Sequence, residues 1–405
     1  MSVTPTARAR SRPSAYQDAL ARLYARSRQG APRDPARTRR LLDALSIPDP
    51  LNVAHVVGTN GKGAVACRID AGLRAAGLRS VRFLSPHVES FAERIALDGR
   101  PVTPEEVMAF LDRLSPHPDA PPAAFFEVVT AMALDLAARG GADWAVLEAG
   151  VGAARDATRA VNAVRVVVIT NVSLDHADVL GPDVAAIAED KAAAIRPGVP
   201  VVTAADGEAL QVVRAVAAAR DAPLHVVRSG RDRGSQGRRV DAVAQDLAAA
   251  ALRCASLPAA ALPTALAAAA RPPALPARRE AFFVRGRDVL LDGAHNRAAA
   301  EALAEEVPAG AHLLLGIHGR KDADGIRAAL AARAARVRFT APGAGIAAFA
   351  GEPGFDPDPR HALLSALGEV PPGGLLVVAG SFYLAGSVRP WLRAHHDPGA
   401  DRRRG

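Results

Sequence analysis

The sequence predicts an α/β fold in two parts, a P-loop-containing parallel-sheet domain followed by a smaller α/β domain. Three observations lead to this prediction. An apolar run at 53–58 stops at glycine and precedes a helical pattern at about 62–76, the order strand, loop, helix that opens many α/β domains. The wholly apolar runs at 144–148 and 164–170 are typical of parallel strands buried on both faces. A second alternation of strands and helices starts after a proline cluster near residue 273.

The remaining elements follow from hydrophobic periodicity and from glycine and proline positions. In the first part we expect helices at 14–48, 104–114, 125–139, 183–195, 207–219 and 241–254, and strands at 81–84 and 199–203. In the second part we expect strands at 288–292, 311–316, 336–340 and 374–379, and helices at 297–306 and 322–334. The predicted domains are a tail and first helix (1–35), a central domain (36–272), a C-terminal Rossmann-like α/β domain (273–395) and a disordered tail (396–405).

Composition excludes several classes of protein. The chain has 405 residues with 49% apolar residues, yet no apolar run reaches the roughly 18 to 20 residues of a membrane helix. Its two cysteines, Cys67 and Cys254, cannot form a disulfide framework, and no apolar signal segment follows the N-terminal arginines. The net charge of +8 is spread along the chain, and aromatics are only 4%, so nothing indicates nucleic-acid binding. We expect a cytoplasmic protein that contacts neither membrane nor nucleic acid.

Lysine is rare in this chain. Of the 50 basic residues, 47 are arginine, and the lysines are Lys62, Lys191 and Lys321. A chain that uses arginine for ordinary positive charge retains lysine where a compact ammonium, or an amine that can lose its proton, is needed. Chance survival is a reasonable explanation for any one of them, but a weaker one for all three, because each falls inside a motif described next.

The strongest motif is the stretch Gly58-Thr59-Asn60-Gly61-Lys62-Gly63 between a strand and a helix. Its glycines let backbone N–H groups face an anion, and the helix N-terminus adds partial positive charge. Lys62 can reach the outer phosphates of a nucleotide. The full P-loop pattern is absent, because Val56 occupies the place of its first glycine. We interpret the stretch as a phosphate-binding loop rather than an ordinary turn.

An ordered set of stretches resembles the folylpolyglutamate/dihydrofolate synthases of the Mur ligase superfamily. The resemblance covers residues 36–203 well and 273–390 more loosely. The stretches are His55–Gly63, Ser85-Pro-His87, Glu93-Arg-Ile95, Phe126-Glu127 with Thr130, Glu148 to Asp156-Ala-Thr158, Asp175-His176, Leu180-Gly181, Glu189-Asp-Lys191, Pro197-Gly198, Pro276-Ala-Arg278, Asp292-Gly-Ala-His-Asn296, Lys321-Asp322 and Gly380-Ser-Phe-Tyr-Leu384.

The resemblance implies an ATP-dependent amide ligase that adds L-glutamate to dihydropteroate or a reduced folate through an acyl phosphate. It also implies a monomer and two Mg²⁺ ions, one held by Ser85 and Glu148 and the second by His176 with a carbamylated Lys191. Lys62, Glu148, His176 and Lys191 are the implied catalytic residues. The implied nucleotide contacts are Gly58, Thr59, Asn60, Gly61, Lys62, Gly63, Arg278, Asp292 and His295. Phe126 and Asp156 are the implied contacts of the pterin.

Plainer interpretations stay open for four of these residues. Glu148 could be a helix cap or half of an ion pair, although it ends an apolar strand where open α/β sheets place their ligands. His176 could be a local hydrogen-bonding partner of the Asp175 loop, and Asp156 a loop cap. Lys191 could be a cation that complements a helix C-terminus, but this chain uses arginine for that purpose at Arg196.

The match also departs from the family pattern. Alanine or arginine replaces expected residues at Ala64, Ala92, Ala153, Ala154, Arg159, Arg239 and Ala242, and the segment 204–272 leaves little room for the family's small antiparallel sheet. These changes fall on substrate loops and one nucleotide contact. They keep two alternatives open: a Mur-type ligase for another carboxylate and amine, and a catalytically silent nucleotide-binding paralogue.

Overall fold

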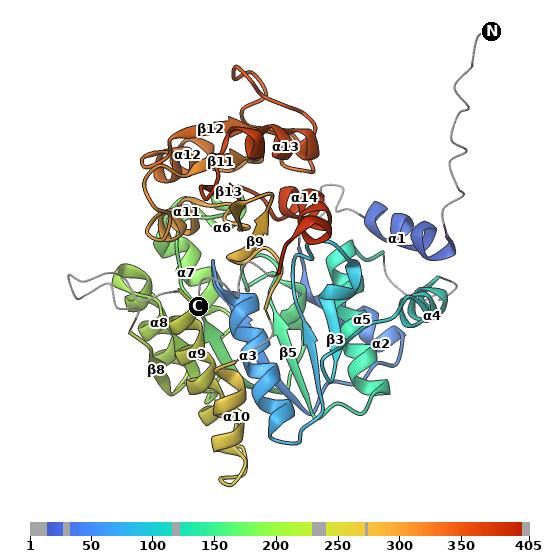
Figure 1. The fold of residues 1–405 in the computed structure, drawn as a ribbon. Helices are drawn as coiled ribbons and strands as arrows, with labels where there is room; N and C mark the ends of the chain where they lie inside the picture. The colour runs from blue at the N-terminus through green and yellow to red at the C-terminus, as the bar shows by residue number, and fades with distance from the viewer. Residues whose placement is uncertain (1–13, 27–32, 116–121, 229–239, 272–273, 399–405) are drawn as a thin grey trace.

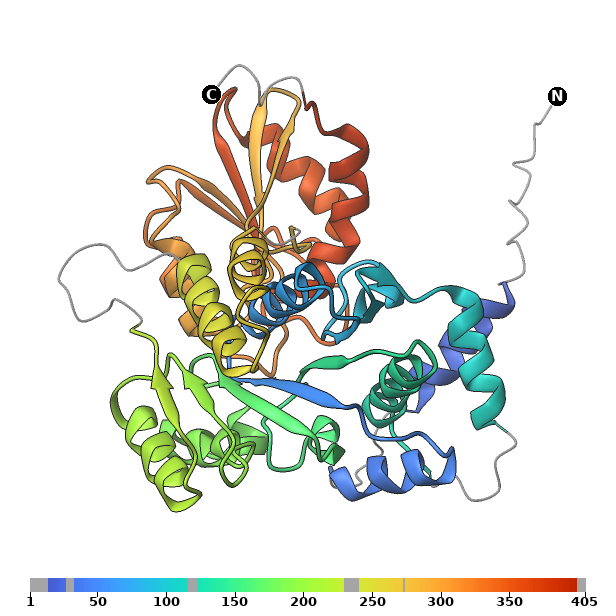
Figure 2. The same ribbon diagram turned by 90° about the horizontal axis from the view of Figure 1, so that it is seen from below.

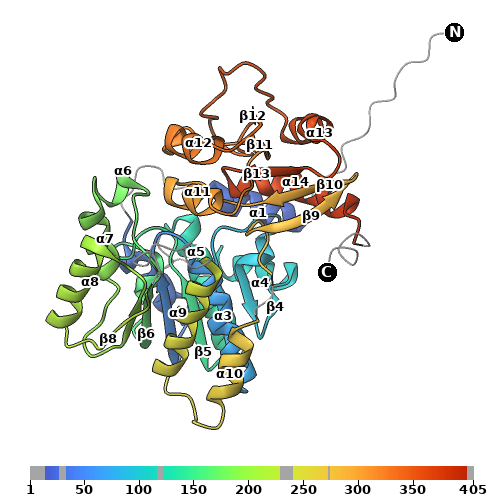
Figure 3. The same cartoon turned by 60° about the vertical axis from the view of Figure 1, so that its left-hand side comes forward.

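The computed structural model describes residues 14–26, 33–115, 122–228, 240–271 and 274–398. Two sheets form two lobes, and the smaller, C-terminal lobe stacks on one end of the larger one (Figures 1 and 3). The predicted α/β fold class in two parts is confirmed. Residues 1–13 of the predicted segment 1–35, residues 399–405 of the predicted tail 396–405, and residues 272–273 at the predicted boundary lie outside the described residues, so the exact domain limits stay a prediction.

The larger sheet has eight strands in the order β4-β3-β2-β5-β1-β6-β7-β8. The strands are β1 (Asn52–Val57), β2 (Ser80–Phe83), β3 (Ile95–Leu97), β4 (Arg100–Pro101), β5 (Trp144–Glu148), β6 (Val164–Ile169), β7 (Val201–Thr203) and β8 (Leu224–Val226). Pairing is parallel from β2 to β8, while β3 and β4 add an antiparallel edge. The central strands are buried on both faces, which explains their continuous apolar runs.

Helices cover both faces of this sheet, and each face has its own apolar core (Figure 2). One face packs against α1 (Ala15–Ala25), α2 (Pro35–Ala44), α4 (Pro104–Leu114), α5 (Phe125–Arg139), α7 (Val184–Ala192) and α8 (Gly207–Ala219). The other packs against α3 (Lys62–Ala75), α9 (Val240–Cys254) and α10 (Leu262–Ala269). Short helices α6 (Ala177–Leu180), η1 (Phe91–Arg94) and η2 (Ala157–Ala160) lie in the connecting loops. No helix of the described residues has the length and apolar character needed to cross a membrane.

The second sheet has the order β12-β11-β13-β10-β9 and is parallel except for β9. Its strands are β9 (Glu280–Val284), β10 (Arg287–Leu291), β11 (His312–Leu315), β12 (Arg336–Phe339) and β13 (Leu375–Ala379). Its helices are α11 (Arg297–Ala304), α12 (Ala323–Ala331), α13 (Pro359–Glu369) and α14 (Phe382–His395). Two further apolar clusters fill the two faces, so this part has a core of its own.

Most predicted elements are present, with three kinds of error. The helix expected at 183–195 ends at Ala192, and the strand expected at 199–203 begins at Val201. Short strands β3, β4, β8 and β9 and helices α13 and α14 were not predicted. Helix α10 was not predicted because Pro263 suggests a break in the chain's helical pattern. Pro263 in fact lies in the first turn of α10, where proline is tolerated. Among the described residues of 204–272, the one strand is β8, and it pairs with β7 in parallel.

The ends of three neighbouring strands position the candidate site. β1, β5 and β6 lie side by side, and their carboxyl ends lead into Gly58, Ala149 and Thr170. Open α/β sheets bind ligands outside this edge. The second domain meets the first here, since Asn296 contacts Asn60 across the boundary. The fold therefore brings the glycine loop and the C-terminal motif residues to one place.

Candidate active site

The glycine loop has the strand–loop–helix geometry that the sequence predicts. β1 ends at Val57 and α3 begins at Lys62. Gly58 has a φ of 139°, and a Cβ there would lie 2.0 Å from Thr170 Oγ1, so only glycine fits. Gly61 precedes the helix in the left-handed region, with a φ of 81°. The backbone can thus turn its N–H groups toward an anion, although phosphate binding itself stays a prediction.

Lys62 lies at the start of α3 with its ammonium directed back over the loop. Its Nζ donates to Gly58 O at 3.2 Å and to Thr59 O at 3.1 Å. Burial lowers the pKa of Lys62; Glu148 counteracts this effect, and the positive charge of Arg278 adds to it. An ammonium bonded only to carbonyl oxygens retains a net positive charge for an incoming phosphate.

Glu148 and Ser85 are brought together at the ends of β5 and β2. The Glu148 side chain is buried, and its Oε2 accepts from the Ser85 backbone N–H at 2.9 Å. Burial raises the pKa of Glu148, while Lys62 and Arg278 lower it. Glu148 is therefore neither a helix cap nor half of a direct ion pair among the described residues. Its role as a metal ligand stays a prediction.

Side chains from both domains approach Gly63, at the start of α3. A Cβ on Gly63 would lie 3.3 Å from Glu148 Oε2 and 3.2 Å from Arg278 Nη2. Arg278 comes from the second domain, and its guanidinium lies 4.9 Å from the centre of the Phe382 ring. The predicted nucleotide contact Arg278 is thus held over the first turn of α3, beside Glu148.

Lys191 is a buried lysine on the last turn of α7. It is only 2% exposed, and within the described residues no hydrogen bond or ion pair reaches its Nζ. Burial, followed by the charge of Lys62, lowers the pKa of Lys191 to about 7. A cation that served the helix C-terminus would bond the last carbonyls, so the contacts do not support that alternative.

His176 stands in a left-handed conformation, with a φ of 52°, just before α6. Its Nε2 lies 3.9 Å from Asp175 Oδ2, which is too long for a hydrogen bond. Burial and the charge of Lys321 lower the pKa of His176 to about 4, so the imidazole is neutral at physiological pH. A neutral imidazole is the form that binds metals.

The predicted metal ligands fit Mg²⁺ only in part. The Ser85 hydroxyl and the Glu148 carboxylate are oxygen donors of the kind that Mg²⁺ prefers, and they are neighbours. Among the described residues no group of three or more His, Cys, Asp or Glu side chains could hold a metal ion. A second metal site at His176 with a carbamylated Lys191 therefore stays a prediction.

The second domain contributes groups that its own backbone holds in place. Asp292 accepts from Arg279 N at 2.9 Å and from Ala294 N at 2.8 Å. The His295 ring lies 2.8 Å from Gly293 O through Nδ1, and its pKa is lowered by burial to about 4. Nδ1 therefore carries the proton, and Nε2 faces the first domain. Both predicted residues lie on the loop before α11, at the domain interface.

The predicted pterin contacts form part of the loop after β5. Asp156 caps η2: Oδ1 accepts from Thr158 N and Oγ1 at 3.0 and 2.6 Å, and Oδ2 accepts from Gly150 N and Val151 N at 3.1 Å each. The loop-cap alternative thus describes its contacts, and binding of a pterin by Asp156 stays a prediction. Phe126 packs directly on Gly150, where a Cβ would lie 2.7 Å from its ring.

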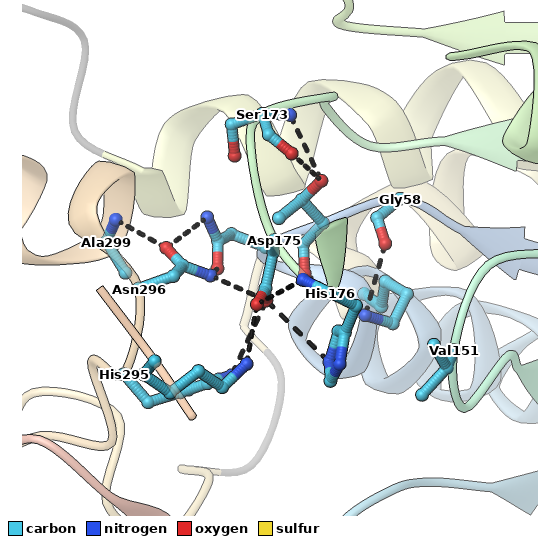
Figure 4. A network of polar contacts seen from close by, with 12 residues as sticks. Gly58, Val151, Ser173, Asp175, His176, His295, Asn296 and Ala299 are labelled. Carbon is cyan, nitrogen blue, oxygen red and sulfur yellow. Dashed lines mark hydrogen bonds and ion pairs between the residues drawn. The ribbon is translucent and has the colours of Figure 1, made fainter. Parts of the chain in front are cut away.

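One group of residues was not predicted as part of the site. Asp175 binds Lys321 Nζ at 2.5 Å and Asn296 Nδ2 at 3.0 Å, and Asn296 in turn bonds Asn60 of the glycine loop (Figure 4). Burial alone would raise the pKa of Asp175, but Lys321, His176 and His295 lower it well below its usual range. The signal was present, since Asp175 and Lys321 both stand in quoted motifs, but nothing in the sequence joins them.

Comparison with known proteins tests the expected resemblance. A probable bifunctional folylpolyglutamate synthase/dihydropteroate synthase of Haloferax volcanii is 44% identical over 182 residues, which cover 44% of this chain and 22% of that protein. A dihydrofolate synthase/folylpolyglutamate synthase of Bacillus subtilis is 36% identical over 220 residues, 52% of this chain and 51% of that protein. The bifunctional folylpolyglutamate synthase/dihydrofolate synthase of Yersinia pestis, complexed with AMPPNP and Mn ion, superposes with a TM-score of 0.79 at 27% identity, over 94% of this chain and 98% of that structure.

The resemblance to the folylpolyglutamate/dihydrofolate synthases is confirmed. It holds in the sequence over about half of the chain (52%) and in the fold over 94% of it. The sequence matches span at most about half the length of these two curated relatives. No protein-family profile matches the chain. The chain therefore has the fold of the folylpolyglutamate synthases.

Proposed function

We propose that this protein is an ATP-dependent ligase that joins L-glutamate to dihydropteroate, to reduced folates, or to both. The observation that carries the proposal is the meeting of Lys62, Glu148 and Arg278 around Gly63. Two cations and one carboxylate then surround the space above a glycine loop. Such an arrangement suits a reaction in which several negative oxygens come together.

The proposed reaction has two steps. An oxygen of the acceptor carboxylate attacks the γ-phosphorus of ATP, the bond to the bridging oxygen breaks, and ADP leaves. The amine of glutamate then attacks the acyl carbon, the carbon–oxygen bond to phosphate breaks, and the nitrogen loses a proton as the amide forms. Lys62 holds phosphate oxygens during the first step, and Arg278 holds them from the second domain. Coverage by the second domain keeps water away from the acyl phosphate.

The metal set is proposed on the chemistry of its donors. Ser85 and Glu148 would hold one Mg²⁺, and His176 with a carbamylated Lys191 would hold a second, the ions supplying positive charge that neutralises the phosphate oxygens. The support for the carbamate is the position of Lys191, which is buried without a partner in the described part of the chain. Such an amine is more favourable in its neutral form, which can add CO₂.

The protein's setting is part of the same proposal. We place it in the cytoplasm as a monomer without nucleic-acid partners. Both of its cysteines are free thiols, as a reducing compartment would leave them.

The deciding experiment measures ADP release and the mass of the product. Purified protein is mixed with ATP, Mg²⁺ and L-glutamate, and with dihydropteroate or tetrahydrofolate in separate reactions. We expect ADP release that depends on both glutamate and a pterin acceptor, with a product heavier by one or more glutamyl units. Another ligase would release ADP only with a different carboxylate and amine, and a silent paralogue would bind nucleotide without release. Either result would overturn the proposal.

A further inference from the structure

Two carboxylates of the first domain form ion pairs with the second domain: Glu89 with Arg389 and Arg393, and Asp175 with Lys321 beside the glycine loop. Asp175 lies in the loop after β6, and its side chain is 8% exposed. Its Oδ1 accepts from Lys321 Nζ at 2.5 Å and from the backbone N–H of His176 at 2.9 Å. Its Oδ2 accepts from Asn296 Nδ2 at 3.0 Å. Lys321 and Asn296 both belong to the second domain, so one side chain binds two elements across the boundary.

Asn296 passes this contact on to the glycine loop. Its Nδ2 donates to Asn60 Oδ1 at 2.9 Å, and its Oδ1 accepts from Asn60 Nδ2 at 3.2 Å, a reciprocal pair of amides. The same Oδ1 caps α11 by accepting from Ala299 N at 2.9 Å. Asn296 is 3% exposed and uses its oxygen and its nitrogen twice each. Because a buried polar group without a partner is unfavourable, this geometry tolerates little displacement.

We propose that Asp175 is a positioning residue that locks the second domain in register over the glycine loop, acting through Lys321 and Asn296. This inference rests on the proposed function, since it names how the nucleotide contacts of the second domain are aligned for transfer. Figure 4 shows the arrangement: Asp175 lies at the centre, with Asn296 on one side and His176 on the other. Asp175 touches no reacting atom in this scheme.

The consequence for the reaction follows from the loop that carries Asn296. Asp292 and His295 lie on the same loop, four residues and one residue before Asn296. Fixing Asn296 against Asn60 therefore fixes these predicted nucleotide contacts relative to Lys62. A misplacement of about 1 Å in such an arrangement can lower turnover about 100-fold. An ion pair whose only effect was to stabilise the fold would change the melting temperature and leave turnover per folded molecule unchanged.

Charge distinguishes Asp175 from an ordinary hydrogen-bonding residue. Lys321 is 19% exposed and donates to Asp175, and the imidazole Nε2 atoms of His176 and His295 each lie 3.9 Å from its Oδ2. The direct partners of the carboxylate are the Lys321 ammonium, the Asn296 amide and the His176 backbone N–H, and no other acid of the described residues is in direct contact. Removing its charge while keeping its shape should release Lys321 and loosen the domain contact.

The test uses D175N, K321M, K321R and the double variant D175N/K321M in the full chain. E369Q serves as a matched control, because Glu369 binds Arg336 and Arg338 within the second domain only. For D175N and K321M we expect kcat to fall about 10- to 100-fold with a smaller change in KM for ATP. The kcat of the double variant should be no lower than that of either single variant, because D175N and K321M remove the same interaction. K321R keeps the charge and should retain more activity than K321M.

A second measurement is independent of turnover. Hydrogen exchange of residues 58–62 and 292–299 should rise in D175N and in K321M, while E369Q matches the parent protein and thermal midpoints stay close together. If the protein proves inactive as a ligase, this measurement still tests the lock and only the proposed function fails. Unchanged exchange at both segments, or losses in kcat that add in the double variant, would overturn the inference.

Discussion

The two sides of the domain interface treat charge in opposite ways. On the first domain, Lys62 bonds only carbonyl oxygens, and Lys191 has no partner among the described residues. On the second domain, Asp292 accepts two hydrogen bonds from its own loop, and the imidazole of His295 bonds Gly293 O. These two lysines of the first side therefore lack carboxylate partners among the described residues, whereas Asp292 and His295 are held by hydrogen bonds to their own loop. Under the proposed function, we infer from this difference that the first domain carries the reacting groups and that the second covers them.

Of the substitutions considered, removal of the Lys62 ammonium should lower turnover the most. The Lys62→Ala variant loses the ammonium over the glycine loop, so we expect kcat to fall about 100- to 1000-fold while the thermal midpoint changes little. Lys62→Arg should also be strongly impaired, because a planar guanidinium does not fit a loop closed on a compact ammonium. Coupled ADP-release assays with circular dichroism as the folding control measure both. Full activity in either variant would show that the loop does not act on phosphate.

Substitutions of Lys191 test whether its ε-amine is converted into a negatively charged carbamate. If Lys191 is carbamylated, Lys191→Ala should lose about 100-fold or more in turnover and regain part of it with a small carboxylate such as formate at high concentration. Lys191→Arg should be equally impaired, because a guanidinium does not form a stable carbamate. Intact-protein mass and the dependence of activity on dissolved CO₂ provide independent measurements. A fully active Lys191→Arg variant contradicts the carbamate.

Substitution of Arg278 tests how much the second domain contributes to ATP binding. Its guanidinium stacks on Phe382 and reaches the space beside Gly63. We expect Arg278→Ala to raise KM for ATP about tenfold, the size of one lost charge-assisted hydrogen bond, with a smaller effect on kcat. Arg279→Ala is the matched control, because the neighbouring Arg279 pairs with Glu306 instead. Equal effects of the two substitutions would remove the nucleotide role of Arg278.

His55 should show the smallest effect, on stability rather than on turnover. It is fully buried on β1, with Nε2 2.8 Å from Thr158 Oγ1 and no hydrogen bond at Nδ1. Burial, with Arg196 and Arg159, lowers the pKa of His55 from 6.5 to about 3. The unfolded chain therefore binds more protons between these values, and stability falls as the pH drops below 6.5.

The His55→Gln variant removes this proton uptake. Its free energy of unfolding, measured in urea at pH 7, 6 and 5, should decline less steeply than that of the parent, by up to about 1.4 kcal/mol per pH unit. The comparison uses slopes, so a uniform loss of stability from the substitution does not affect it. Identical slopes for both proteins would mean that His55 is protonated in the fold.

Local patterns predicted much of the first domain's site. The glycine loop, the end of β5 at Glu148 and the lysine on α7 each depend on residues close together in the chain, and each lies where the sequence places it. Asp156 shows the limit of such reasoning. A carboxylate after a glycine-rich turn can serve a ligand or its own loop, and the choice depends on backbone geometry that the residue types leave open.

The residue pairs that join the two domains could not be predicted from the sequence. Asp175 and Lys321 are 146 positions apart, and Asn60 and Asn296 are 236 apart. Such pairs form only once two independent cores have been seated against each other, and no periodicity describes that orientation. The short edge strands were missed for a related reason. β4 has two residues and β3 has three, too few for an alternating pattern.

The placement of the lysines also bears on how the protein reacts with chemical probes. Lys62 lies on the glycine loop, Lys191 is buried close enough to Lys62 for that charge to lower its pKa, and Lys321 binds Asp175 at 2.5 Å, so the ε-amines of the whole chain lie in one region. Reagents that acylate amines usually modify lysines over the whole surface of a protein. On this chain the same reagents would find their ε-amine targets only at the domain interface. Their reaction would therefore report on occupancy of the site, and a bound nucleotide would protect the lysines it covers.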